Sequence, residues 1–566
     1  MQPHRPVVAG ATHVVSAGHY LAAQAGFAIL EAGGNAIDAG VAAGIVLGVV
    51  QTDRVNFAGV APIILYLASE RRVMTLDGLG HWPRAADVRV FIERHGGHMP
   101  PGILRTVIPA APSAWITALE RFGTMSFGDV AQAAIRFARD GFPMHWLMAE
   151  WIAADEEAYR RWPETAAVFL PEGKPPRVGA PFVQADLGRT LQYMADQEAA
   201  HASAGRAAGL RAAHDAFYRG DIAATIAAYH RAHEGWVTAD DLAGYRVRFE
   251  PPVHTRVRDI DLHACGPWCQ GPVLLETLNV LAGLDLRAAG HNSPAYVHAL
   301  TEAIKLAYAD RHAWFGDPRF VDVPIERLLA KDYADERRRA IDPQRAYPGM
   351  PPAGMAKTTS ELQSSIAETE PEPDTSYVCV IDRHGNAFSA TPSDASSATP
   401  VIPGTGLCPS SRGSQSWCDP AHPSVLAPGK RPRLTPSPAL ALREGKAYLA
   451  FGSPGNDVQP QAMLQAFLNV HVFDMDVQSA VEAPRFASFS FPQSSEPHTY
   501  RPGRLNVESR VAGSTRDALA ALGHDVVTWP ERDWHAGAVC MVRVDPRTGV
   551  LEGAADPRTP SAALGW

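Results

Sequence analysis

Cysteine is scarce in this chain, which has six in 566 residues. The two nearest to one another, Cys265 and Cys269, are separated by three residues, and no matching cluster of histidines accompanies them. This spacing argues against a structural zinc site and against a redox-active dithiol. We therefore expect ordinary reduced cysteines, and we assign neither a metal nor any other cofactor.

Long apolar runs and strong charge are also missing. The longest apolar run, near residues 41–50, is too short to span a bilayer, and the first 20 residues do not have the pattern of a signal peptide. A formal net charge of −9 is mild over this length and argues against nucleic acid as the main partner. With 46% hydrophobic and 20% charged residues, the composition favours a soluble, globular, cytoplasmic enzyme without a membrane or nucleic-acid partner.

Helical patterns dominate the first part of the chain, and strand patterns dominate the last. Residues 18–32 have apolar side chains at helical spacing, and Asn35 is placed to cap a second helix over 36–51. Residues 113–340 are mostly helical in pattern. Strands are expected over 61–68, 73–78, 255–265, 376–382, 386–393, 438–444, 446–454, 525–530 and 538–546. Such segregation predicts sheets packed together with helices outside, a layered α+β architecture.

The chain changes character between residues 340 and 374, where it is polar, contains prolines and lacks periodicity. We interpret this segment as an exposed, flexible linker. It ends at Asp374, and Thr375 then opens a segment with a strand pattern. Threonine favours strands, so a purely structural role is one interpretation.

The other interpretation is that the chain is cut between Asp374 and Thr375. An N-terminal threonine carries a hydroxyl and a free α-amine, whose unperturbed pKa is about 7.7–8.0. It therefore combines a nucleophile and its base in one residue. The same hydroxyl can make the cut, by attacking the Asp374 carbonyl to form an ester that water then opens.

Several stretches carry a resemblance to a known family. They are GFAILEAGGNAIDAGVAA (26–43), CGPWCQGPVLLETLNVLAGLDL (265–286), DTSYVCVIDRHGNAFSAT (374–391), GKRPRLTPSPAL (429–440) and AFGSPGNDVQPQ (450–461). Together they resemble the γ-glutamyltranspeptidase family of self-processing N-terminal-nucleophile hydrolases. The resemblance implies a four-layer αββα sandwich, made of a large subunit, 1–374, and a small subunit, 375–566, from one precursor. It leaves open a dimer of the processed heterodimer.

The resemblance also assigns the catalytic residues. It places Thr375 on the family's nucleophile, with the register set by the turn at 382–386. Ser393 falls where the family has a hydroxyl that bonds the nucleophile's amine. Gly455 and Asn456 fall on a pair whose backbone N–H groups form the oxyanion hole.

The substrate pocket departs from the family pattern. Leu79 stands where true transpeptidases have the arginine that binds the glutamate carboxylate, and Leu434 and Thr435 replace a serine pair. Because a buried charge without its partner is costly, these changes argue against efficient γ-glutamyl transfer. Arg412 offers a different cation, in a stretch similar to the oxamate amidohydrolase-like branch; its alternative role is a surface or structural salt bridge. We assign Arg412, Thr435 and Asp457 to substrate binding.

The function predicted from these residues is a self-cleaving amidohydrolase. It would hydrolyse an amide bond of a small, carboxylate-bearing substrate through a threonine acyl-enzyme, with Asp374–Thr375 as the processing site. One alternative is a true γ-glutamyltransferase or glutathione hydrolase with a rebuilt pocket. Another is an uncleaved, inactive homologue that acts as a binding protein.

Overall fold

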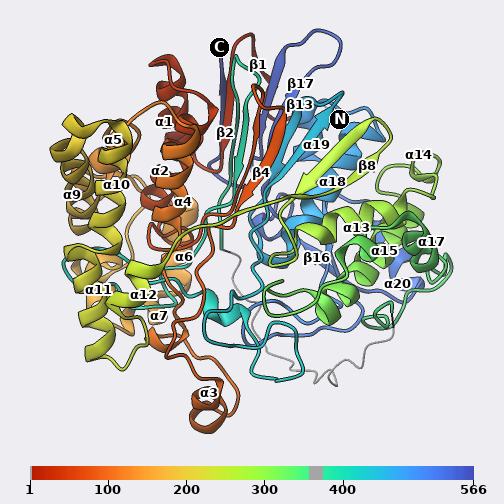
Figure 1. Ribbon diagram of the computed structural model, residues 1–566. Helices are drawn as coiled ribbons and strands as arrows, with labels where there is room; N and C mark the ends of the chain where they lie inside the picture. Colours follow the sequence, from red (N-terminus) through yellow and green to blue (C-terminus); the bar gives the residue numbers. More distant parts are fainter. Residues whose placement is uncertain (1–2, 356–373) are drawn as a thin grey trace.

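Two seven-stranded antiparallel sheets form the centre of the molecule (Figure 1). The computed structural model describes residues 3–355 and 374–566. The first sheet has the order β1 (Val8–Gly10), β18 (Leu551–Ala555), β17 (Cys540–Val544), β13 (Lys446–Gly452), β12 (Ala439–Arg443), β9 (Ile260–Ala264), β8 (Val253–Val257). The second has the order β19 (Ala562–Gly565), β2 (Val14–Ala17), β10 (Val378–Ile381), β11 (Ala387–Ala390), β3 (Ile63–Leu67), β4 (Arg72–Leu76), β7 (Phe249–Glu250).

The alternation of side chains along β10 shows how the sheets are stacked. Successive side chains of a strand point to opposite faces. Val378 and Val380 belong to the core shared with the helices. Cys379 and Ile381 belong to a second core that includes Leu440 of the first sheet. The two sheets therefore pack face to face.

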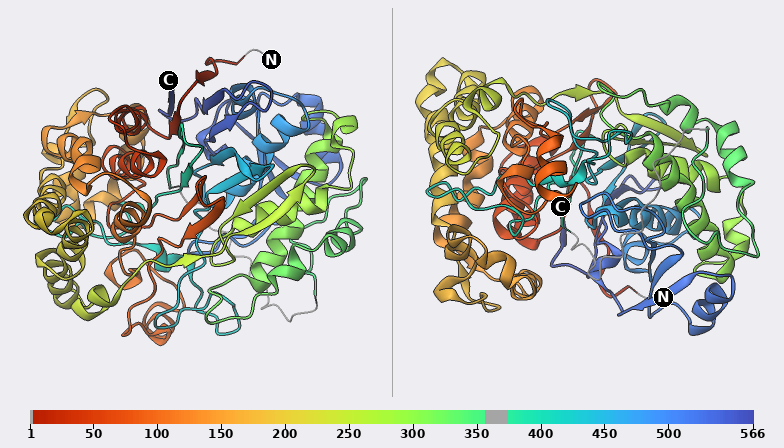
Figure 2. Two further views of the ribbon diagram at one scale, coloured as in Figure 1. Left: turned by 45° about the horizontal axis from the view of Figure 1, so that its top comes forward. Right: turned by 90° about the horizontal axis from the view of Figure 1, so that it is seen from below.

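Helices cover the outer face of each sheet (Figures 1 and 2). The second sheet is covered by a layer that includes α1 (Tyr20–Glu31), α2 (Ala36–Val50), α4 (Ala111–Phe122), α5 (Phe127–Asp140), α9 (Ala185–His201) and α10 (Arg206–Tyr218). The first sheet is covered by a layer that includes α13 (Gly271–Leu281), α15 (Pro294–Trp314), α18 (Gln459–His471) and α19 (Val477–Glu482). This is the predicted αββα sandwich, which is confirmed.

The helix predicted after Asn35 forms α2, with a reciprocal cap at its start. The Asn35 side chain accepts hydrogen bonds from the N–H groups of Ile37 and Asp38, and the Asp38 carboxylate accepts from the Asn35 N–H at 3.0 Å. Every residue of α2 is buried, which explains why its apolar run has no polar face. The helix packs on the inner strands that hold the site.

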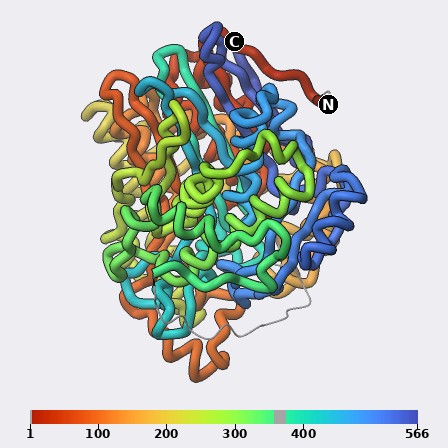
Figure 3. Tube along the Cα trace, turned by 90° about the vertical axis from the view of Figure 1, so that its right-hand side faces the viewer, coloured from red at the N-terminus to blue at the C-terminus, as the bar shows by residue number. Residues whose placement is uncertain are grey.

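Both sheets contain strands from either side of the predicted cut. In the second sheet β10, from after the cut, lies between β2, from before it, and β11. The first sheet contains β13, from after the cut, and β9, from before it. Figure 3 shows the blue C-terminal strands beside the red N-terminal ones, in agreement with the pairings of β1 with β18 and of β2 with β19. The segments 1–374 and 375–566 are therefore not separate folding units.

The predicted linker begins too early. Ala346 is buried, and the Gly354 N–H donates to the Asp310 carboxylate at 2.6 Å. The start of the predicted linker is thus packed on the helical layer, and residues 356–373 lie outside the described residues. In the described parts of the chain, no helix combines the length and the apolar character needed to cross a membrane.

Candidate active site

Thr375 lies three residues before β10, opposite Ser393. The antiparallel register explains this position, because Val378 pairs with Ala390 and the two chains continue past these residues. The Oγ atoms of Thr375 and Ser393 are 2.6 Å apart, and both residues are fully buried. The Thr375 N–H donates to the Arg54 carbonyl at 3.1 Å. The structure thus brings together the predicted nucleophile and the predicted second hydroxyl.

The turn between β10 and β11 sets this register. One oxygen of Asp382 accepts from the N–H groups of His384 and Asn386 at 2.9 and 3.0 Å. The other oxygen accepts from the Asn386 side chain and from the Ala36 N–H at the start of α2, both at 2.9 Å. Gly385 has φ 78°, a left-handed conformation that favours glycine. The Asp-x-x-Gly-Asn pattern therefore ties the hairpin to a helix and fixes which hydroxyl faces Ser393.

The peptide bond between Asp374 and Thr375 is held in an unusual conformation. Thr375 has φ 94°, which is rare for a β-branched residue and indicates local strain. The Asp374 carbonyl, at the bond predicted to be cut, accepts a hydrogen bond from the Gly455 N–H at 3.4 Å. The strained backbone of Thr375 and the Gly455 donor therefore lie on either side of the bond that is predicted to be cut.

The predicted oxyanion residues follow β13 in a left-handed turn. Gly455 has φ 117° and Asn456 has φ 48°. A Cβ atom at Gly455 would meet nothing closer than 3.6 Å, so the backbone conformation rather than space requires glycine. The Asn456 carbonyl accepts from the Gln270 side chain at 2.7 Å, which holds the turn in place.

Arg412 lies beside Ser393 and Asp374 in the interior rather than on the surface. It begins η4 (Arg412–Gln415) and is 2% exposed. Its Nη2 donates to Ser393 Oγ at 2.5 Å and to the Asp374 carboxylate, and its Nε lies 3.7 Å from an oxygen of Asp394. Burial alone would lower the pKa of Arg412, but the two carboxylates outweigh burial and raise it. Arg412 is therefore a cation in contact with the hydroxyl of Ser393, which in turn contacts that of Thr375.

Thr435 and Asp457, the other two predicted substrate-binding residues, do not line the cavity at this site. Thr435 is fully buried and its hydroxyl accepts from the Gln415 side chain at 2.9 Å. The Asp457 carboxylate is occupied by Arg311 and Ser494. Their contacts give both residues a role in holding the site, so we withdraw them from the substrate-binding set.

The cavity in front of Asp374 has a volume of about 490 Å³ and contains two arginines that the sequence reasoning missed. Arg54 is clamped by Asp53 at 2.9 and 3.0 Å and lies near the rings of Trp151 and Trp534. Burial lowers the pKa of Arg105 to about 10, so Arg105 remains a cation at neutral pH. Among the described residues, Arg54 Nη1 and Arg105 Nε have no hydrogen-bond partner.

These arginines carried only a faint sequence signal. Arg54 follows the end of α2 by four residues, in an Asp-Arg pair within a buried turn. Arg105 lies in a short 3-10 segment, η1 (Ile103–Arg105). Neither position belongs to a motif with a fixed spacing to Thr375, and only the fold brings both arginines to the cavity that Asp374 lines.

Two of the positions that depart from the family's glutamate pocket, Leu79 and Leu434, share one apolar cluster. Leu79 and Leu434 pack with Val60, Trp268 and Cys269, and all five side chains are buried. The place of the missing arginine is therefore filled by a small hydrophobic core. The carboxylate of a glutamyl substrate would find no charged partner among these five side chains.

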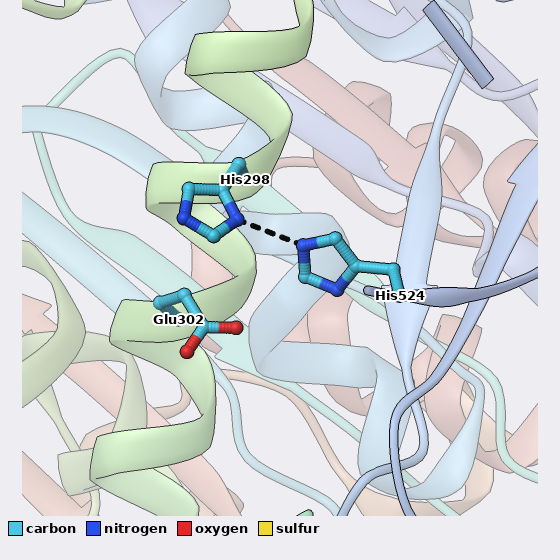
Figure 4. Close-up of side chains that lie close together, drawn as sticks. All are labelled: His298, Glu302 and His524. Carbon is cyan, nitrogen blue, oxygen red and sulfur yellow. Dashed lines mark hydrogen bonds between the residues drawn. The ribbon is translucent and has the colours of Figure 1, made fainter. Parts of the chain in front are cut away.

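A cluster outside the site contains His298 and Glu302 of α15 and His524 after α20 (Gly513–Ala521) (Figure 4). The two histidine rings are hydrogen-bonded at 2.8 Å. The Glu302 carboxylate accepts from Lys305 at 2.7 Å and from the Tyr347 N–H at 3.1 Å. The potential ligand atoms already form hydrogen bonds, and the Lys305 ammonium group lies beside them, so we assign no metal to this cluster. It instead joins α15 to the segment after α20.

The arrangement around Asp374 is suited to acyl transfer. It combines a buried hydroxyl, a second hydroxyl under a guanidinium group, and an N–H donor directed at a strained carbonyl. Such donors stabilise the negative charge that develops on a carbonyl oxygen under attack.

Comparisons with known proteins agree with this geometry. The family model described as Gamma-glutamyltranspeptidase matches residues 22–566. The chain is 31% identical to the glutathione hydrolase-like YwrD proenzyme of Bacillus subtilis, with 99% of each chain covered, and 32% identical to the acylase ACY 1 proenzyme of a Pseudomonas strain, with 98% of this chain and 94% of the relative covered. The solved structure of LmbA2991HD superposes with a TM-score of 0.94 at 35% identity, over the whole of both chains. The chain therefore belongs to the γ-glutamyltranspeptidase family and is an N-terminal-nucleophile hydrolase of its acylase and amidohydrolase type.

Proposed function

We propose that this protein is a self-cleaving amidohydrolase in which Thr375 is the nucleophile. The precursor is cut between Asp374 and Thr375 into a large subunit, 1–374, and a small subunit, 375–566. The mature enzyme then hydrolyses an amide bond of a small, carboxylate-bearing substrate. The word proenzyme in the names of the related proteins supports processing from one precursor.

One observation carries the proposal. The hydroxyls of Thr375 and Ser393 are in contact at 2.6 Å, and the carbonyl of Asp374, directly before Thr375, accepts from the Gly455 N–H at 3.4 Å. A peptide bond with a nucleophile on one side, a donor on its oxygen and strain in its backbone is prepared for cleavage.

The same groups account for catalysis after the cut. The freed amine of Thr375, near the Arg54 carbonyl, accepts the hydroxyl proton as Oγ1 attacks the substrate amide. The N–H groups of Gly455 and Asn456 stabilise the oxyanion, and Ser393 holds the nucleophile in line. The amine leaves with a proton, and water then hydrolyses the ester to release the acid and restore Thr375.

Subunit masses on a denaturing gel test this proposal, together with amide hydrolysis. We expect Thr375→Ala to leave one uncut band and no activity. The matched control is Ser376→Ala, which removes the neighbouring hydroxyl from a buried side chain and should still be cut. A fully active wild-type enzyme that remains a single intact band would rule out the mechanism.

A rebuilt γ-glutamyl site is the second candidate. The cavity has cations at Arg54 and Arg105 and carboxylates at Asp155 and Glu496, which together suit a zwitterionic group. Release of glutamate from a γ-glutamyl anilide, at a rate above that of simple acyl anilides, would favour this candidate. An uncut chain that binds such amides without hydrolysing them would instead indicate an inactive homologue.

A further inference from the structure

Asp374 occupies the site through both its backbone and its side chain. Its carbonyl accepts from the Gly455 N–H, and its side chain, only 13% exposed, accepts from Arg412 Nη2 on one oxygen and from Thr375 Oγ1 at 2.9 Å on the other. The residue also lines the cavity of about 490 Å³. A surface linker residue has no need of a buried guanidinium partner.

The chemistry of self-cleavage makes this contact informative about substrates. Given the proposed function, Thr375 Oγ1 forms a C–O bond to the Asp374 carbonyl carbon, the C–N bond breaks, and the hydroxyl proton goes to the new amine. The resulting ester is an acyl-enzyme in which aspartyl is the acyl group. Water then yields the Asp374 carboxylate and restores the hydroxyl.

We propose that Asp374 is the enzyme's first substrate and that Arg412 afterwards binds the carboxylate of each free substrate. In Asp374 the carboxylate is separated from the scissile carbonyl by two carbons. The structure therefore assigns the enzyme to half-amides of four-carbon dicarboxylic acids, namely succinamates and aspartyl amides. This inference rests on the proposed function and names its substrate class.

The environment of Arg412 explains why a new carboxylate is required. When Asp374 leaves, the nearest remaining carboxylate is Asp394, at 3.7 Å from Nε. Asp394 is itself held by Ser410 Oγ at 2.5 Å and by the N–H and hydroxyl of Ser411 at 2.9 and 2.6 Å. A buried guanidinium left with one of its two carboxylates favours an incoming anion, and the length of the Asp374 side chain sets where the anion lies.

A series of p-nitroanilides tests the inference on the mature wild-type enzyme. The acyl groups are those of oxalic, malonic, succinic, glutaric and adipic half-amides, with butyric anilide as the uncharged analogue of the succinic one. We expect kcat/KM to peak at succinyl, about tenfold above malonyl and glutaryl and about a hundredfold above butyryl, as loss of a charge-assisted contact implies. A flat profile, or a peak at another length, overturns the inference. Hydrolysis of any of these anilides that depends on Thr375 leaves the proposed function intact.

Variants at two positions separate the carboxylate subsite from general damage. We expect Arg412→Gln to bring the succinyl-to-butyryl ratio of kcat/KM close to one, whatever the overall rate. If that variant fails to mature, the stabilisation of the mature wild-type enzyme against thermal unfolding by free succinate and by free glutarate decides instead. Succinate should stabilise it more, and equal stabilisation overturns the inference.

Asp374→Asn and Asp374→Glu should slow self-cleavage by about tenfold. Since residue 374 is absent from the small subunit, the matured forms should retain the wild-type substrate profile. Cutting at the wild-type rate in both variants would show that the Asp374 carboxylate does not mark the subsite.

Discussion

Arg431 and Arg412 are both 2% exposed, but their partners differ in kind. Arg431 is bonded at 3.0, 2.9 and 2.9 Å to the carboxylates of Asp77, Glu250 and Asp317, which lie in three separate segments. All three partners remain in place after the proposed cut. Arg412 instead depends on Asp374, the residue at the cut itself. The comparison separates an arginine that holds the fold from one that is available to a ligand.

The pKa values of the aspartates beside Arg431 reflect this network. Burial would raise the pKa of Asp317, but the hydrogen bonds and charges of Arg431 and Arg319 outweigh it and hold the pKa below its usual value. For Asp77 burial prevails and raises the pKa to about 6 despite Arg431. Arg431 therefore compensates these two aspartates unequally.

The largest expected effect is on folding, from Arg431→Met. Removing this cation leaves buried carboxylates without a partner, which should lower the free energy of unfolding by about 3–5 kcal/mol. Thermal or denaturant unfolding of the purified variant measures this. The control is Arg443→Met, which removes an exposed pair with Asp259 at 2.8 Å and should cost about 0–1 kcal/mol. If the Arg431→Met protein keeps its stability and loses only activity, Arg431 does not hold the fold and the distinction from Arg412 is wrong.

A pH-dependent effect should follow from Asp77→Asn. The folded-state pKa of Asp77, about 6, lies above its ordinary value of 3.8. Asp77 therefore stabilises the fold most below pH 4, and that contribution is lost as the pH rises through 6. Relative to Asp77→Asn, the wild type should lose up to about 3 kcal/mol of unfolding free energy between pH 4 and pH 7. Unfolding curves at the two pH values measure the difference. A difference that is the same at both pH values would place the pKa near its ordinary value.

The smallest effect should be seen at Ser393, and in rate rather than stability. Ser393→Ala removes the hydroxyl between Thr375 and Arg412, so kcat and the rate of self-cleavage should fall by about 10- to 100-fold, or about 1.4–2.7 kcal/mol. Ser393→Thr keeps the hydroxyl and should recover most of both rates. Equal losses in the two variants would mean that packing, not the hydroxyl, matters at this position.

Local patterns were sufficient to predict the elements that carry the nucleophile. The Asp-x-x-Gly-Asn turn and the alternating residues of β10 depend on hydrogen bonds and side-chain directions within a few residues. The capping role of Asn35 before α2 is local in the same sense. The choice of Thr375 over Ser376 came from the family resemblance, with the register set by this turn, and in the structure Thr375 Oγ lies 2.6 Å from Ser393 Oγ.

The pocket was less predictable, because its residues come from distant segments. Asp457 was assigned to substrate by its motif, yet a buried pair with Arg311 occupies it. Arg54 and Arg105 had no motif, yet both line the cavity. A charged side chain shows in sequence only that it needs a partner, and the partner is chosen by packing.

By itself, the sequence predicted the layered fold from its periodicity and turn chemistry, and its motifs identified the family and placed Thr375 at the predicted cut. Only the tertiary structure decided which buried arginine is already neutralised and which is not. Arg431 and Arg412 both look like isolated cations in the chain. They differ because folding brings three lasting carboxylates to Arg431, whereas Arg412 has one lasting carboxylate, Asp394, and the Asp374 side chain. Charge compensation acts over a few ångströms in space and is independent of distance along the chain.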